Sequence, residues 1–298
     1  MRLAFTKMEA AGNDYIYVDG IERHLPDADW PALARDLSRR RHSVGADGII
    51  LILPSESADF RMRLFNADGS EGDMCGNGVR CVGAYVWERG LIGVDSFSVE
   101  TPDGPVTVRV QPEDGELSVD ALMTPPRFLR GEIPMTGQPE ESGLAAELEV
   151  GGRSVPVDAL RLGNPHCVLF VRDVYAVDVA TLGPLLESHP AFPERTNVEF
   201  VEVADRDALR VRVWERGSGI TAACGTGASA AAVCAILRGR VTSPVRVEMP
   251  GGDLRVEWDE AQRLHLCGIV REVYRGSLEI PGELLMTGDF ETGGGRGR

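Results

Sequence analysis

The chain has 298 residues, of which 43% are hydrophobic and 26% charged, an ordinary composition for a globular protein with enough length for two cores. Its formal net charge of −15 argues against nucleic acid as a partner, because phosphates would be repelled. No apolar stretch approaches the ~20 residues of a membrane span, and the first residues read as a strand, so we expect no membrane partner, no signal peptide and a cytoplasmic location.

The first half of the chain reads mainly as strands in which polar and apolar residues alternate, which suits sheets with one buried face. A helix is predicted over 30–40, with Asp29 as N-cap and Pro31 in the first turn. A second helix, over 79–88, is apolar nearly all round apart from Arg80, which is typical of a helix buried on every side. The predicted strands are 16–18, 49–52, 61–64, 97–99, 106–110 and 117–119.

The second half repeats this scheme after a segment rich in Gly, Pro and Glu, residues 130–153, which we interpret as the interdomain connection. Helices are predicted over 181–188 and 228–237, and the latter is again apolar, with Ser229 as its polar break. A strand near 275–284 has no counterpart in the repeat and is expected to cross back to the first domain. Residues 289–298 are expected to be a disordered tail. The remaining predicted strands are 167–171, 198–203, 209–214, 245–247, 254–256 and 264–266.

An internal duplication organises the chain. The frame Cys75-Gly76-Asn77-Gly78 returns as Cys224-Gly225-Thr226-Gly227, and three further pairs follow the same order about 150 residues apart. We therefore predict an α+β fold of two pseudo-symmetric domains, 1–125 and 126–272, each a mostly antiparallel or mixed curved sheet around a central helix. The further pairs are 12–13 with 163–164, 60–65 with 209–214, and 99–104 with 247–252.

Cys75 and Cys224 each open one of the two apolar helices. A helix N-terminus offers free N–H groups and a partial positive charge, so we expect the pKa of both thiols to be lowered. Two like groups facing one ligand from opposite sides suit a reaction that removes a proton from one face of a carbon and adds one to the other. The other cysteines are interpreted as small buried hydrophobes: Cys81, Cys167, Cys234 and Cys267.

The glycines beside these two cysteines allow the backbone to approach a ligand, and with the helix N–H groups they predict an anion site. A carboxylate fits best, since neither a Walker ending nor a complete dinucleotide fingerprint is present. No cysteine or histidine spacing predicts a metal site. Lys7 is the only lysine, so pyridoxal phosphate chemistry has a single candidate. Amides and one arginine at strand ends suit a zwitterionic amino acid: Asn13, Asn66, Asn164, Asn197 and Arg216.

These motifs together resemble the diaminopimelate epimerase family over nearly the whole chain except the tail. The resemblance rests on Gly12-Asn13-Asp14, residues 65–71, Met74 to Gly78, Gly163 to Cys167, Glu215-Arg216-Gly217 and Ala223 to Gly227. It implies a cofactor-independent isomerase that interconverts LL- and meso-2,6-diaminopimelate by a two-base mechanism, in lysine and peptidoglycan precursor biosynthesis. A homodimer is a further expectation.

Carried over by position, the resemblance implies that Cys75 and Cys224 are the acid and base, and that His166 and Glu215 tune the thiols. It implies that the reacting carboxylate is held by Gly76, Asn77, Gly225 and Thr226. The remaining substrate contacts, mainly to the distal end, would be Asn13, Asn66, Asn164, Asn197, Glu215 and Arg216.

Three positions depart from the family pattern: Gly48 replaces a substrate-contacting glutamine of some relatives, Ile220 a common glutamate and Ala10 a frequent glycine. The main alternative is a proline or hydroxyproline racemase of the same superfamily, although Asn77 and Glu215-Arg216 favour diaminopimelate. A non-catalytic thiol sensor or metal-binding module is the alternative from another class.

Overall fold

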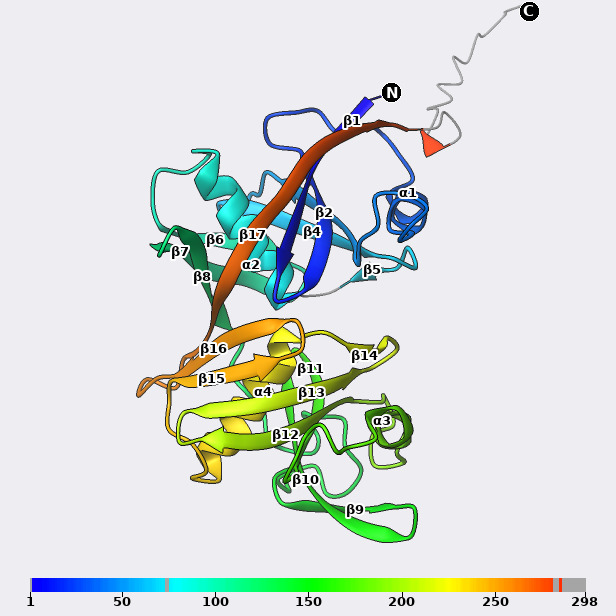
Figure 1. Cartoon of the computed structure of the whole chain (residues 1–298), viewed down its shortest axis with the longest axis vertical. Coiled ribbons are helices and arrows are strands. Elements are labelled where there is room, and N and C mark those ends of the chain that lie inside the picture. Colours follow the sequence, from blue (N-terminus) through cyan, green and yellow to red (C-terminus); the bar gives the residue numbers. More distant parts are fainter. Residues whose placement is uncertain (1, 73–74, 281–283, 286–298) are drawn as a thin grey trace, which may run out of the picture.

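The computed structural model describes residues 2–72, 75–280 and 284–285, which form two lobes stacked along the long axis of the molecule (Figure 1). The first lobe contains β1 (Arg2–Ala10), β2 (Asn13–Asp19), α1 (Trp30–Leu37), β3 (Gly48–Leu53), β4 (Phe60–Asn66), β5 (Glu71–Gly72), α2 (Gly76–Glu88), β6 (Ser96–Thr101), β7 (Gly104–Glu113) and β8 (Glu116–Met123). The second contains β9 (Ala146–Val150), β10 (Arg153–Leu162), β11 (Asn164–Phe170), α3 (Val179–Glu187), β12 (Asn197–Asp205), β13 (Ala208–Glu215), β14 (Gly219–Thr221), α4 (Gly225–Leu237), β15 (Val245–Met249) and β16 (Gly252–Trp258). No helix of the described residues is long and apolar enough to cross a membrane.

The long strand β17 (Leu264–Glu279) belongs to both lobes (Figure 1). Its beginning pairs antiparallel with β16 and with β8, and its end pairs with β1, where Arg2 lies opposite Glu279. We propose on this basis that residues 1–125 are completed by the end of β17, while 126–272 form the second domain. Residues 281–283 and the predicted tail, 289–298, lie outside the described part of the chain.

Each lobe wraps strands around one central helix, as the sequence predicts. Helix α2 packs against β1, β2, β6, β7 and β8, and α4 packs against the strands from β10 to β13 and against β15 and β16. Every residue of α2 from Gly76 to Val86 is buried, and α4 is buried over the stretch from Gly227 to Ala235. The α+β architecture of two similar halves is therefore confirmed, and it places the N-termini of both central helices at the boundary between the lobes.

Helix α1 is shorter than predicted. The side chain of Asp29 caps it by accepting a hydrogen bond from the N–H of Ala32, but the helix ends at Leu37 rather than Arg40. Beyond this end, the Arg40 side chain turns to Asp14 and Asp47, where two carboxylates compensate its charge. The helical pattern therefore stops where this ion pairing begins.

The interpretation of 130–153 as an interdomain connection is wrong. Ile133 and Met135 are buried in a core of the second lobe together with residues of β9 and β10. Strand β9 also pairs with β10, so this segment is part of the second lobe. The chain instead passes between the lobes just after β8, because Arg127 already forms a bridge with Arg161 of β10.

Candidate active site

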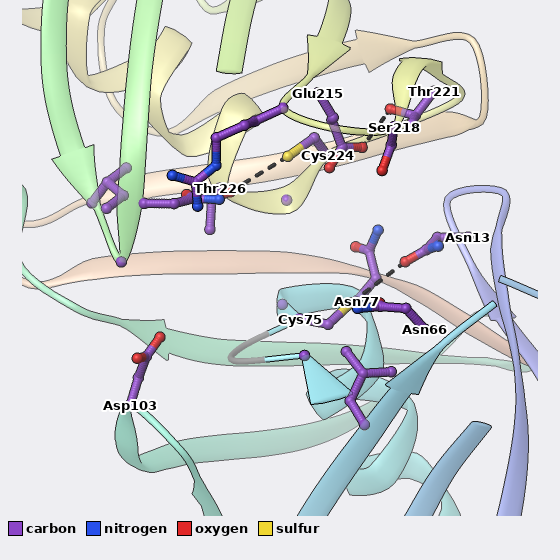
Figure 2. Close-up of a pocket in the computed structure, with 18 of the residues that line it drawn as sticks. Asn13, Asn66, Cys75, Asn77, Asp103, Glu215, Ser218, Thr221, Cys224 and Thr226 are labelled. Atoms are coloured by element: carbon purple, nitrogen blue, oxygen red, sulfur yellow. Dashed lines mark hydrogen bonds between the residues drawn. The ribbon is translucent and has the colours of Figure 1, made fainter. Parts of the chain in front are cut away.

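A cleft of about 1330 Å³ lies between the lobes and is lined by residues of both. Figure 2 shows Cys75 with Asn13, Asn66 and Asn77 on one side, and Cys224 with Glu215, Thr221 and Thr226 on the other. Most of the predicted site residues line this cleft: Asn13, Asn66, Cys75, Gly76, Asn77, Asn164, Glu215, Arg216, Cys224, Gly225 and Thr226. Two predicted residues, His166 and Asn197, do not line it; they are buried behind it.

The first residues of the two central helices meet at this cleft. A Cβ atom built on Gly225 would lie 3.8 Å from the Cα of Gly76 and 3.5 Å from the Oδ1 of Asn77. The same atom would lie 2.8 Å from the Cδ2 of Leu266, a side chain of β17 that also contacts the Gly76 position. Any side chain at Gly225 would therefore have to displace Leu266, whereas its distances to Gly76 and Asn77 would be ordinary contacts. The free N–H groups of two helix starts face one shared space, which suits a carboxylate.

Cys75 is the N-cap of α2 and is half-buried. Its Sγ accepts a hydrogen bond from the N–H of Gly78 at 3.2 Å and lies 3.4 Å from the Oδ1 of Asn13, to which the thiol donates. The hydroxyl of Tyr15 is also within hydrogen-bonding reach of this sulfur. The Cys75 thiol thus has defined partners while its sulfur still faces the cleft.

Cys224 occupies the matching position as N-cap of α4 and is 7% exposed. Its Sγ lies 3.4 Å from the N–H of Gly227 and 3.4 Å from the hydroxyl oxygen of Thr226. The carboxylate of Glu215 is the acidic group that acts most strongly on the Cys224 thiol, and it accepts a hydrogen bond from the hydroxyl of Thr221. The repeat therefore places two thiols in equivalent caps but gives them different polar surroundings.

The predicted lowering of the thiol pKa values is wrong for both cysteines. Burial raises the pKa of Cys75, against hydrogen bonds from Gly78 and Tyr15 that favour the thiolate. Burial also raises the pKa of Cys224 well above the usual thiol value, and the charge of Glu215 raises it further. Removal from water penalises the thiolate more than the helix N–H groups stabilise it.

The sequence did not reveal the ionic network that holds Asn13. Its amide Nδ2 donates to Asp47 Oδ2 at 2.6 Å, and the backbone N–H of Asp14 donates to the same oxygen at 3.0 Å. Arg40 pairs with both carboxylates, while Lys7 pairs with Asp14 at 2.6 Å and donates to the carbonyl of Gly45. The turn signal around Gly45 and Gly48 could have drawn attention to Asp47. The only lysine is thus engaged in a salt bridge.

A second buried network holds Asn164. The ring nitrogens of His166 lie 2.8 Å from Asn164 Oδ1 and 2.7 Å from Glu199 Oε1. Both ring nitrogens therefore have a hydrogen-bond partner. Among the described residues, His166 forms no hydrogen bond with the thiol of Cys75 or of Cys224. Glu199 is fully buried, and burial raises its pKa although His166 opposes this. His166 is therefore placed to orient Asn164, and its electrostatic interactions with Glu199 and Glu215 link it indirectly to Cys224.

Asn197 orients the loop that carries Arg216. Its Oδ1 accepts from the backbone N–H of Arg216 at 2.9 Å, and its Nδ2 donates to the carbonyl of Pro165 at 3.2 Å. The Arg216 guanidinium donates to the carbonyl of Glu194 at 3.1 Å and lines the cleft.

On the opposite lobe, Asn66 ends β4 and donates to the hydroxyl of Ser70 at 3.0 Å. Asn66 therefore both closes a turn and faces the cleft.

The remaining four cysteines do not line the cleft. Cys81, Cys167 and Cys234 are fully buried, in agreement with their interpretation as hydrophobes, whereas Cys267 is only half-buried. In the described part of the chain, all six cysteines are free and no group of three His, Cys, Asp or Glu side chains has a geometry that could hold a metal ion.

Comparison with known proteins gives consistent matches. The diaminopimelate epimerase family model matches residues 5–129 and 159–275. The chain is 46% identical over 273 residues to a diaminopimelate epimerase of Pelotomaculum thermopropionicum, covering 91% of this chain and 97% of that one. It is 48% identical over 275 residues to that of Desulforudis audaxviator, covering 92% and 98%.

Among solved structures, a PhzF-family phenazine biosynthesis protein of Bacillus anthracis is similar with a TM-score of 0.69 at 18% identity, covering 94% of this chain and 100% of that one. A hydroxyproline epimerase of Agrobacterium vitis is similar with a TM-score of 0.67 at 18% identity, covering 93% and 92%. These two likenesses support the fold, while the identity to the sequence relatives and the family model decide the family. The chain belongs to the diaminopimelate epimerase family.

Proposed function

We propose that this chain interconverts LL- and meso-2,6-diaminopimelate without a cofactor, as a two-base epimerase in lysine and peptidoglycan precursor biosynthesis. The observation that carries the proposal is the pair of cysteine-capped helix starts, Cys75 and Cys224, which face one cleft from opposite lobes. The names of the sequence relatives supply the substrate.

In the reaction, one cysteine acts as thiolate and the other as thiol. The thiolate forms an S–H bond with the α-proton, and the electron pair of the broken C–H bond moves into the substrate carboxylate. The second thiol then gives its proton to the opposite face of the α-carbon and becomes the thiolate. One sulfur gains a proton and the other gives one up, so the proton count of Cys75 and Cys224 together is unchanged by a turnover.

The charge that develops on the reacting carboxylate is met by the two helix starts. The residues proposed to hold it are Gly76 and Asn77 from α2 and Gly225 and Thr226 from α4, all of which line the cleft. Preorganised N–H donors that point at developing charge stabilise the transition state more than the ground state. The close contact between Gly76 and Gly225 supports a single carboxylate shared by both helices.

The distal end of the substrate also carries an ammonium and a carboxylate, which suit the amides and the ion pair partners at the cleft rim. Asn13, Asn66, Asn164, Glu215 and Arg216 line this space and are proposed as direct contacts. Asn197 and His166 would act indirectly, because their polar atoms hold the Arg216 backbone and the Asn164 amide.

The raised pKa values of the thiols fit a substrate-assisted reaction. Burial favours the neutral thiol at Cys75 and Cys224. An α-ammonium group brought beside the sulfur would favour the thiolate by direct charge interaction. We therefore expect the reactive thiolate to be formed mainly when the amino acid is bound, and Glu215 to modulate the charge of Cys224.

The proposed location is the cytoplasm, and six free cysteines support a reducing compartment. We also propose a homodimer, for which the exposed neighbours Val273 and Tyr274 on β17 provide an apolar surface. Light scattering on the purified protein measures the particle mass and would contradict the dimer if it gave the mass of one chain.

The substrate is tested by assaying purified enzyme in parallel with LL-diaminopimelate, L-proline and trans-4-hydroxy-L-proline under reducing conditions. We expect meso-diaminopimelate from the first and no change in optical rotation with the other two. Racemisation of proline or hydroxyproline without turnover of diaminopimelate would replace this proposal by the racemase alternative.

A further inference from the structure

Arg80 is a fully buried arginine behind the start of α2, with 0% of its surface exposed. Its Nη2 donates to Asn77 Oδ1 at 2.6 Å, but Nε and Nη1 have no hydrogen-bond partner among the described residues. No carboxylate of the described residues forms an ion pair with it. A buried charge without a partner costs several kcal/mol of desolvation, so its presence calls for a reason other than stability.

The fold makes room for this guanidinium. A Cβ atom at Gly268 on β17 would lie 2.5 Å from Arg80 Nη1, so a larger residue there would collide with the side chain. Burial lowers the pKa of Arg80, while negative charge on the neighbouring sulfurs of Cys81, Cys75 and Cys267 would favour its charged form. Arginine remains protonated in proteins, so every nitrogen of this side chain is a donor.

This donor-only character determines how Asn77 is oriented. The two ends of an asparagine amide have similar shape, and only their hydrogen-bond partners decide which end is oxygen. Because Arg80 can only donate, the amide oxygen must face it. The Nδ2 group of Asn77 is then the end that remains to donate, and Asn77 lies beside Cys75 on the wall of the cleft (Figure 2).

The second half of the repeat lacks this pair. The positions equivalent to Asn77 and Arg80 are Thr226 and Ser229, and Ser229 Oγ donates to the carbonyl of Gly225 at 2.9 Å. The hydroxyl of Thr226 lies beside Cys224 instead. A threonine hydroxyl can rotate to donate or accept and needs no partner to fix it. Of these two equivalent positions, the one paired with an amide carries the buried arginine, and the one paired with a hydroxyl carries a serine.

We propose that Arg80 is a positioning residue that fixes the Asn77 amide so that its Nδ2 donates to the reacting carboxylate of the amino-acid substrate. The claim rests on the proposed epimerase function for the identity of that carboxylate. The interaction strengthens as negative charge builds up on the carboxylate, so its loss lowers kcat more than it raises KM.

The test compares the full-length variants R80M, R80K and N77A, the double variant N77A/R80M and the matched control S229A, which changes the equivalent position of α4. Steady-state kinetics with LL-diaminopimelate give kcat and KM. For R80M we expect kcat to fall by about 10²-fold, since a misplaced group costs about that much. R80K retains a donor-only group and recovers most of the loss, and S229A stays within a few-fold of wild type.

Two outcomes separate positioning from a structural role. Because R80M removes a buried unpaired charge, its thermal midpoint should equal or exceed that of the wild type. In the N77A background, R80M should cost little more, because the residue through which Arg80 acts is absent. Wild-type kcat in R80M, a loss of kcat that follows only a loss of folded protein, or losses that multiply in N77A/R80M would overturn the proposal.

A further measurement keeps this inference separate from the proposed function. The side-chain amide signals of Asn77 in ¹⁵N–¹H spectra, identified by their absence in N77A, should shift or broaden in R80M and remain in place in S229A. If the wild-type enzyme failed to turn over diaminopimelate, the proposed function would fall while this readout still tested the orientation. Unchanged Asn77 signals in R80M would refute the positioning role whatever the substrate is.

Discussion

The amide of Asn13 donates to Asp47 across 2.6 Å, and this one contact decides which end of Asn13 faces the Cys75 thiol. Asp47 is paired with Arg40, and an ionised carboxylate can only accept, so the Asn13 oxygen is left for the thiol at 3.4 Å. Arg80 fixes Asn77 by the opposite logic, since it can only donate. Two asparagines beside one thiol are thus each held by a partner with a single hydrogen-bonding role.

Replacing Asp47 by Asn should therefore impair the reaction. An amide at this position can donate or accept, so Asn13 would no longer be held in one orientation, and a hydrogen bond to a charged group contributes about 1.5–3 kcal/mol. We expect kcat/KM to fall by roughly 10- to 100-fold, which is that energy expressed as a rate ratio. Arg39→Gln, a change in an exposed ion pair of the same region, is the control and should leave kcat/KM unchanged. Wild-type kinetics in the Asp47 variant would contradict this orientation of Asn13.

The meeting of the two central helices predicts a strong effect of Gly225→Ala on activity. The new Cβ would press on Leu266 at 2.8 Å and narrow the space beside Gly76, although alanine is favourable in a helix. We expect at least a tenfold loss of kcat/KM, as a displacement of catalytic groups by a fraction of an ångström is costly.

Gly239→Ala is the matched control for this substitution. Gly239 has φ +63, and no atom lies within 4 Å of the place that a Cβ would occupy, so alanine there meets backbone strain but no collision. It should lower the free energy of unfolding by about 1–2 kcal/mol and leave kcat/KM unchanged. Equal kcat/KM values of the two variants would argue against a close contact between the starts of the two central helices at Gly225.

The charge of Glu215 predicts how the two thiols respond to pH. Burial is the main reason that the pKa of Cys224 is raised, and the Glu215 carboxylate adds to it; for Cys75 its contribution is smaller than those of burial and the Gly78 hydrogen bond. Glu215→Gln removes a negative charge, so the pKa of Cys224 should fall and its alkylation by iodoacetamide should begin at lower pH. Peptide mass spectrometry across a pH series measures both sites. If the pH at which alkylation begins fell more at Cys75 than at Cys224, Glu215 could not act mainly on Cys224.

The buried thiols also predict a loss of stability in alkaline solution. Burial raises the pKa of Cys234 well above the usual thiol value and raises that of Cys81 to about 12. A raised pKa in the folded state contributes stability below the unfolded pKa of ~8.5, and this stability is lost as the pH rises through the folded value. Each such thiol can lower the free energy of unfolding by about 1.4 kcal/mol per pH unit in that window.

Urea unfolding at pH 7.5 and at pH 10, in the presence of a reductant, measures this effect. The wild-type protein should be less stable at pH 10, and Cys234→Ala should lose less stability between the two pH values because one buried titrating group is removed. A free energy of unfolding that stays constant or increases from pH 7.5 to 10 would exclude the proposed linkage.

The amino-acid sequence predicts those parts of the fold that depend on local pattern. The apolar helices that begin after Cys75 and Cys224 are confirmed, because a helix without a polar face can only be buried. The strands with alternating residues are likewise present. By contrast, the segment 130–153 looks like a linker in composition, but tertiary packing buries Ile133 and Met135 in the second lobe. Composition does not reveal which loop a neighbouring sheet will cover.

The candidate site is likewise only partly predictable from the sequence. Motif residues such as Asn66 and Arg216 line the cleft, and their roles in substrate binding stay predictions. The contact of Asp47 with Asn13 depends on how two segments of the first lobe meet, and the turn signal around Gly45 and Gly48 is its only trace in the sequence. Arg80 and Asn77 lie three residues apart on α2, so the sequence makes them neighbours on the helix but does not show that the arginine is buried there. The sequence also fails to predict the direction of the thiol pKa values, because desolvation depends on the whole surrounding structure rather than on the helix start alone.

If Cys75 and Cys224 act on opposite faces of one carbon, every inversion must bring a solvent-derived hydrogen to that carbon, and solvent isotope labelling detects it. LL-diaminopimelate is incubated in deuterated water with wild-type enzyme, Cys75→Ala or Cys224→Ala. The isomers are then separated, and the deuterium content of each is measured by mass spectrometry. Wild-type enzyme should give one deuterium at the inverted α-carbon of the first meso product, and neither variant should give any meso product. A meso product that keeps its original α-hydrogen, or wild-type turnover by either single variant, would contradict the two-base mechanism.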